Sequence, residues 1–229
     1  MRCALACLLL VLLGAGCSSG GGAGLPVFDA QRFGTAVDNL YFPLEPGTTY
    51  VFEADTEDGL ERVEVEITDQ TRVVMGVTCV VVHAREYLDG ELVEDTFDWF
   101  AQDLDGNVWY FGEDSKEIEN GVVVSTEGSW EAGVDGARPG IIMLAAPWIG
   151  VTYEQEYAPG VAEDMATVVG LSDTATTPLG SFTGCVRTED FTPLEPGVME
   201  EKFYAPGLGV VLEVDDEGNR TELVDILGG

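Results

Sequence analysis

Alternation of apolar and polar residues, interrupted by glycine-containing turns, is the feature that most constrains this chain. Residues 63–68 read Val-Glu-Val-Glu-Ile-Thr, which places Val63, Val65 and Ile67 on one face of a strand and the acids on the other. Turn signals such as Asp58-Gly59 recur at intervals of roughly 8–12 residues, and no helical pattern of four turns is evident. We therefore predict an all-β fold: an antiparallel meander forming a curved sheet, half-barrel or sandwich.

The clearest hairpin in the pattern joins two aromatic strands, residues 92–102 and 108–111. Asp105-Gly106-Asn107 supplies a tight turn between them, because Gly and Asn accept backbone conformations that most residues resist. Further strands are expected at residues 49–54, 63–68, 77–87 and 122–124, and near 151–157, 161–171, 181–191, 199–205, 208–214 and 220–226.

Residues 131–150 break this rhythm. Their sequence, EAGVDGARPGIIMLAAPWIG, is rich in Gly, Pro and apolar side chains, which predicts one long Gly/Pro-rich loop. Two roles are open for it: a loop that seals one end of the core, or a lid over a ligand cavity, since loops on rigid β scaffolds often carry binding residues.

Composition limits the partners of the chain. Of its 229 residues, 45% are hydrophobic, which is sufficient for a buried core, while the formal net charge is −32. Such a chain repels phosphates, so no nucleic-acid partner is expected. The acids allow either a solvated, self-repelling surface or a site for Ca²⁺ or a cationic partner.

The first seventeen residues have the organisation of a secretory signal peptide: Arg2, an apolar run too short to span a bilayer, and small residues before Cys17. The segment LGAGC at 13–17 resembles the lipobox of bacterial lipoproteins, with Gly14 where that family usually has Leu, Val or Ile. The resemblance implies cleavage before Cys17, whose sulfur and new amino group then carry fatty acyl groups such as palmitate.

We therefore divide the chain into three parts. Residues 1–16 form the signal peptide, residues 17–40 hold the lipidated Cys17 with a Gly/Ser-rich tether and a short arm, and residues 41–229 form a single β domain. The lipoprotein resemblance implies an extracytoplasmic location in the cell envelope, tethered to a membrane by the lipid anchor, and to the outer membrane if the host has two.

Four segments of the mature part are similar to segments of a group of uncharacterised, acidic, β-rich bacterial envelope lipoproteins. They are YFPLEPGTTY at 41–50, DTFDWFAQD at 95–103, GSWEAGVDG at 128–136 and FYAPGLGVV at 203–211. The resemblance extends over most of residues 40–215, and it implies no activity.

Besides Cys17, two cysteines remain after cleavage, Cys79 and Cys185. An even pair in an exported chain can form a disulfide. Cys79 also lies within an apolar strand, where a free thiol packs as a small hydrophobic side chain. A disulfide and two separately buried thiols therefore both stay open.

Catalytic motifs are weak in this sequence. His83 is the one histidine and lies in an apolar strand, so a structural role is expected rather than a zinc site or a serine triad. A glycosidase needs two carboxyls flanking an aromatic-lined cleft, and three acids lie close in sequence to tryptophans: Asp98, Glu113 and Glu131 near Trp99, Trp109 and Trp130. With 42 acids and four tryptophans, such proximity arises by chance.

Residues 103–107, Asp-Leu-Asp-Gly-Asn, resemble the start of a calcium loop, but the later ligands are missing and the same residues suit a hairpin turn. We expect no cofactor and no metal site. The expected function is a non-catalytic binding or structural module of the cell envelope whose partner is an apolar ligand or an envelope protein. The alternatives are a Ca²⁺-stabilised extracytoplasmic module and a carbohydrate-active enzyme.

Overall fold

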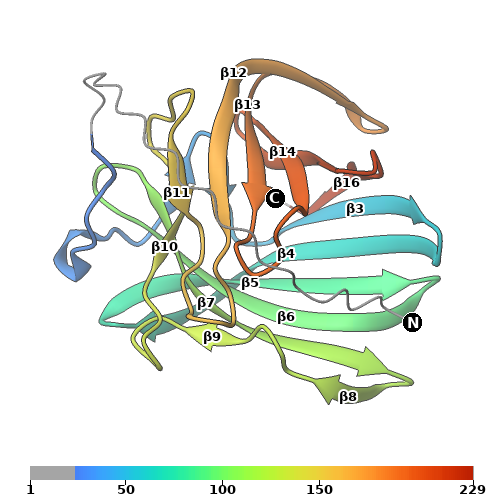
Figure 1. The fold of residues 1–229 in the computed structure, drawn as a ribbon, viewed down its shortest axis with the longest axis horizontal. Coiled ribbons are helices and arrows are strands. Elements are labelled where there is room, and N and C mark those ends of the chain that lie inside the picture. Colours follow the sequence, from blue (N-terminus) through green and yellow to red (C-terminus); the bar gives the residue numbers. More distant parts are fainter. Residues whose placement is uncertain (1–23, 229) are drawn as a thin grey trace.

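The computed structural model describes residues 24–228, and nearly all of their regular structure is antiparallel β (Figure 1). A short 3₁₀ turn, η1 (Ala30–Arg32), precedes a hairpin formed by β1 (Val37–Asn39) and β2 (Phe42–Leu44). The predicted all-β class is confirmed.

The predicted signal peptide and Cys17 lie outside the described residues. Between residues 24 and 228, no helix is both long and apolar enough to cross a membrane.

One large sheet contains the other strands. They are β3 (Thr48–Thr56), β4 (Gly59–Val74), β5 (Val77–Leu88), β6 (Glu91–Gln102), β7 (Val108–Glu119), β8 (Val122–Ser125), β9 (Trp130–Glu131), β10 (Gly140–Met143), β11 (Thr152–Glu154), β12 (Met165–Thr177), β13 (Gly180–Phe191), β14 (Met199–Ala205), β15 (Gly209–Asp215) and β16 (Arg220–Gly228). The order is β10-β7-β6-β5-β4-β3-β16-β15-β14-β13-β12-β11, and β8 and β9 pair with β7. Every hydrogen-bonded neighbour in this order is antiparallel, as expected of a meander.

The sheet bends strongly without closing, and its edge strands β10 and β11 come close together (Figure 1). An isolated bridge joins these edges, in which the amide of Arg138 donates to the carbonyl of Tyr157 at 2.9 Å. Gly140 permits the approach, because a Cβ there would stand 2.0 Å from the carbonyl oxygen of Gln155. A β-bulge between Ile67 and Thr71 of β4 adds to the bend, since bulges increase local twist.

The alternation read from the sequence assigns the two faces of the sheet correctly. Val65 and Ile67 face the inside of the curve. On the outside, Glu64 and Glu66 of the same strand form ion pairs with Arg85, at 3.6 and 3.3 Å. The inward face therefore supplies apolar surface, and the outward face carries paired charges.

Residues 131–150 are largely irregular, as predicted, but they also contain β10, which pairs with the end of β7. Ile141 and Met143 are buried, and Ile142 faces the inside of the curve. The apolar run forms a strand because the free edge of β7 satisfies its backbone hydrogen bonds. The segment thus closes one side of the sheet and contributes one side chain to the interior.

Two N-terminal segments pack against the sheet. Phe28 and Phe33 contact Trp109 and Phe111 of β7, with ring centroids 5.5–6.1 Å apart, so the short arm expected from the sequence is present. The β1–β2 hairpin lies across one end of the curve and forms hydrogen bonds with two turns that are far apart in the sequence. Its Asn39 side chain donates to the carbonyl of Gly106 at 2.8 Å, and its Leu40 carbonyl accepts from Gly207 at 2.6 Å.

The predicted turn at residues 103–107 joins β6 to β7, and the same turn recurs at residues 215–219 between β15 and β16. In each, an aspartate accepts hydrogen bonds from the backbone and side chain of the asparagine four residues later. Asp103 also accepts from the indole nitrogen of Trp109 at 2.9 Å and is buried. Its carboxylate is occupied by protein donors, and residues 24–228 contain no group of three or more His, Cys, Asp or Glu placed to hold a metal ion.

The two equivalent turns allow a paired test. Asp103→Ala should lower the free energy of unfolding by about 3 kcal/mol, because buried donors on Asn107 and Trp109 lose their acceptor. Asp215→Ala should cost less than half as much, since its turn is exposed to water. Urea unfolding, with and without 1 mM Ca²⁺, measures both. Equal losses, or a stabilisation by Ca²⁺ that Asp103→Ala abolishes, would contradict the structural assignment.

Candidate functional site

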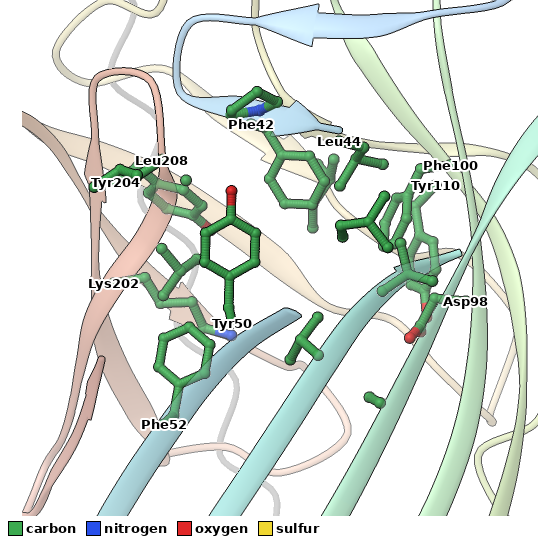
Figure 2. Close-up of a pocket in the computed structure, with 18 of the residues that line it drawn as sticks. Phe42, Leu44, Tyr50, Phe52, Asp98, Phe100, Tyr110, Lys202, Tyr204 and Leu208 are labelled. Atoms are coloured by element: carbon green, nitrogen blue, oxygen red, sulfur yellow. The ribbon is translucent and has the colours of Figure 1, made fainter. Parts of the chain in front are cut away.

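A cavity of about 410 Å³ lies inside the curve of the sheet (Figure 2). Both halves of the sheet and the β1–β2 hairpin contribute to its wall, because each strand turns alternate side chains inward. The apolar and aromatic lining residues are Phe42, Pro43, Leu44, Tyr50, Phe52, Val65, Ile67, Val82, Ala84, Phe100, Tyr110, Ile142, Tyr204, Leu208, Gly209 and Val210. The volume lies in the range of small-molecule sites.

Charged side chains interrupt this apolar wall at separate places. Asp98 comes from β6, Lys202 from β14 and Glu213 from β15, while Glu156 follows β11. In Figure 2, Asp98 lies below Phe100 and Tyr110, and Lys202 lies on the opposite side, beyond Tyr50. A ligand in the cavity would therefore meet aromatic rings along its body and carboxyl groups at its ends.

A bulge in β7 explains how the acids of β6 and β7 come together. The register changes between the pairs Asp98–Glu113 and Phe100–Tyr110, so β7 has one more residue than β6 in this stretch. Gly112 occupies the bulge with a φ of 129°, and a Cβ there would lie 2.3 Å from the carbonyl oxygen of Trp130. As a result, Tyr110 and Glu113 both face inward, three residues apart.

The environment of these acids favours their neutral forms. Burial raises the pKa of Glu113 to about 9, and the carboxyls of Glu156 and Asp98 add to the shift. Burial, followed by the charges of Asp164 and Asp98, raises the pKa of Glu156 to about 8. Burial raises the pKa of Asp98 to about 6, although a 2.5 Å hydrogen bond from the Tyr110 hydroxyl opposes this shift.

A second cluster of acidic side chains surrounds Lys202. The ammonium group lies 2.8 Å from Glu200, 3.9 Å from Asp190 and 4.0 Å from Glu213. Burial lowers the pKa of Lys202, but the three carboxyls outweigh it and raise the pKa well above its usual value. Lys202 therefore stays charged, and the acids around it exceed its single positive charge.

A smaller cavity of about 220 Å³ adjoins the first and shares Ile142, Glu156 and Lys202 with it. Asp190 lines this smaller cavity and is only 5% exposed. Neither of its carboxylate oxygens has a donor at ordinary hydrogen-bond geometry among the described residues. Burial raises the pKa of Asp190, and the Lys202 charge and the nearby side chains of Thr188 and Gln155 oppose this shift only in part. A buried carboxylate with such weak partners is costly, so this group has capacity to bind a donor from a ligand.

The structure brings only some of the candidate site residues named from the sequence together. Asp98 and Glu113 are brought together, whereas Glu131 forms an ion pair with Arg72. Arg72 in turn stacks on Trp99 at 3.9 Å. His83, on the outer face, lies 2.5 Å from Asp95 and stacks on Phe97, in agreement with the expected structural role.

The two cysteines are free, buried thiols, which is the second of the two alternatives left open by the sequence. Cys79 lies on β5 and Cys185 on β13, and the sheet order places five strands between them. Burial raises the pKa of Cys79 to about 12 and also raises that of Cys185. Neither thiol is therefore suited to act as a nucleophile at neutral pH.

Sequence reasoning missed Glu156, Asp190, Lys202 and Glu213 as site residues. A signal was present for one of them, because Lys202 is one of ten basic residues in the chain and lies within an alternating strand.

Comparisons of the chain with protein-family models, with characterised proteins and with solved structures found no match.

The raised carboxyl pKa values predict an unusual dependence of stability on pH. Between pH 6 and 8, Glu113 and Glu156 retain protons in the folded state, whereas unfolded carboxyls with pKa values near 4 have lost them. The folded state then binds more protons, so stability should fall as pH rises, by up to roughly 1.4 kcal/mol per pH unit for each retained proton.

Urea unfolding between pH 5.5 and 8.5 measures this slope. Glu113→Gln should make the slope shallower, because glutamine cannot titrate. The exposed substitution Glu57→Gln should leave the slope unchanged and controls for the overall negative charge. Stability that increases over this range, or a Glu113→Gln slope equal to that of the original chain, would contradict the prediction.

Proposed function

We propose that this protein is a lipid-anchored, extracytoplasmic module of the cell envelope that binds a small apolar ligand without catalysing a reaction. The observation that carries the proposal is the aromatic-lined cavity of about 410 Å³ within the curved sheet. A sheet that needed only a filled core could place larger side chains at Ala84 or Val82, which line the cavity instead. The anchor rests on the lipobox resemblance at Cys17.

Several observations favour binding over catalysis. Glu113, the partner of Asp98, does not line either cavity, so the pair of acids that the sequence suggested for a glycosidase does not flank a common substrate position. His83 lies on the outer face, and the thiols of Cys79 and Cys185 are buried. The residues that contact the cavity are suited to hold and orient a ligand.

The cavity is tested with the mature chain from residue 17, carrying Cys17→Ser so that it is free of lipid. N-phenyl-1-naphthylamine, a neutral dye that fluoresces in apolar surroundings, should bind with a 1:1 stoichiometry. Ala84→Phe should weaken binding at least tenfold by filling the cavity. Thr78→Phe adds the same ring at an exposed position of the same strand and should leave binding unchanged. Equal binding by both variants would refute the cavity as the binding site.

The anchor is tested by labelling growing bacteria that express the full chain with radioactive palmitate. The original chain should incorporate label and sediment with membranes. Cys17→Ser should lose the label, whereas Cys7→Ser should keep it, because residue 7 lies in the part expected to be removed. Label retained by Cys17→Ser would contradict the proposed anchor.

A further inference from the structure

The residues lining the two adjoining cavities are unbalanced in charge. Their acids are Asp98, Glu156, Asp164, Asp190, Glu200, Glu213 and Asp215. Among the described residues that line these cavities, Lys202 is the single basic one. It already lies within 4.0 Å of three of these acids, so it cannot also neutralise Asp98, which belongs to β6 on the other half of the sheet. Asp215 is bonded within its exposed turn and needs no further partner. Glu156 holds a proton near neutral pH because burial and neighbouring acids raise its pKa to about 8, and a cation bound beside it would allow it to ionise. The cavity acids therefore favour a ligand that brings positive charge.

A second, independent observation shows what kind of group is missing. Asp190 is only 5% exposed and lines the smaller cavity. Neither of its carboxylate oxygens has a donor at ordinary hydrogen-bond geometry among the described residues, and the nearby side chains of Thr188 and Gln155 do not offset the effect of burial, which raises its pKa. The nearest cation, the ammonium of Lys202, is 3.9 Å from it, which is beyond hydrogen-bond distance. A ligand that carries N–H donors and a positive charge would satisfy this group.

The surroundings distinguish an organic cation from a metal ion. The described residues offer no group of three or more metal-ligating side chains. Aromatic rings instead stand beside the acids: Tyr110 stacks on Phe100 at 4.6 Å, and its hydroxyl is bonded to Asp98. Aromatic faces attract ammonium groups, and the apolar wall suits a hydrocarbon body. An inorganic cation gains nothing from the apolar wall.

From this arrangement we infer that the ligand is a cationic amphiphile, with an apolar body in the larger cavity and a primary ammonium group among the carboxyls that surround Glu156 and Asp190. This inference rests on the proposed function, because it specifies the ligand of the same cavity. Glu156 is the link between the two parts, since it lines both cavities.

Competition for bound N-phenyl-1-naphthylamine tests the inference, using the mature Cys17→Ser chain in 150 mM salt at pH 7.5. The competitors share a ten-carbon chain and differ in the head group: decylamine, decyltrimethylammonium, decanol and decyl sulfate, each below its micellar concentration. Decylamine should bind at least tenfold more tightly than decanol, and decyl sulfate should bind most weakly. Decyltrimethylammonium, which has charge but no donors, should fall between decylamine and decanol.

Paired variants show whether the cavity acids cause the preference. Asp98→Asn with Glu156→Gln removes two cavity carboxyls and should reduce the preference for decylamine over decanol to about threefold or less. Glu57→Gln with Glu127→Gln removes two exposed acids and should leave the preference intact. This control separates the cavity from the general attraction of a chain with a net charge of −32.

The outcomes separate the two proposals. If neither the dye nor any competitor binds, the proposed function fails and the inference fails with it. If decanol and the dye bind but decylamine binds no more tightly, the cavity binds apolar ligands and only the inference is overturned. If the double cavity variant does not fold, Asp98→Asn alone replaces it and should still reduce the preference for decylamine over decanol, whereas an unchanged preference would overturn the inference. Displacement by 1 mM Ca²⁺ as strong as that by decylamine would also overturn the inference.

Discussion

The bulge at Gly112 is the constraint on which the interior of this protein depends. In a regular strand, Tyr110 and Glu113 would face opposite sides, because side chains alternate with a period of two. The extra residue in β7 turns both inward, so that Tyr110 stacks on Phe100 and Glu113 stands opposite Asp98. Only glycine fits at this point, since a side chain would meet the backbone of Trp130. The position of one small residue thus decides where carboxyl groups enter an apolar interior.

Stability alone does not account for those carboxyl groups. Like charges directly opposite each other destabilise a sheet, and burial of a charge costs several kcal/mol before any partner repays it. Asp98 and Glu113 avoid part of this cost because their pKa values are raised, which leaves Glu113 neutral at pH 7. An apolar pair at the same positions would avoid all of it. Residues that violate the rules of stability in this way are expected at functional sites, and Asp98 of this pair lines the larger cavity, which supports the proposal that the cavity binds a ligand.

The sequence predicted the strands well and the site poorly, for physical reasons that can be named. Alternation within residues 63–68 correctly turned Val65 and Ile67 inward, and the turn at Asp105-Gly106-Asn107 was placed correctly, because both depend on local backbone geometry. The inward position of Glu113 was not predictable from a period of two, because a bulge shifts it. The meeting of Lys202 with Asp190 depends on how β13 and β14 pair, and the approach of the edge strands depends on the bend of the whole sheet. Neither leaves a periodic signal in the chain.

The acids on the outside and the acids in the cavity act on a cationic ligand at different ranges. In physiological salt the field of exposed charges decays over about 8 Å, so the net charge of −32 mainly raises the rate at which cations arrive, and salt suppresses this effect. Asp98 and Glu156 lie among protein atoms, where the effective dielectric is lower and salt screens less. Added salt should therefore slow association without removing the preference among head groups. Under the proposed function, the surface charge therefore acts on the rate of capture, and the few cavity acids act on selectivity.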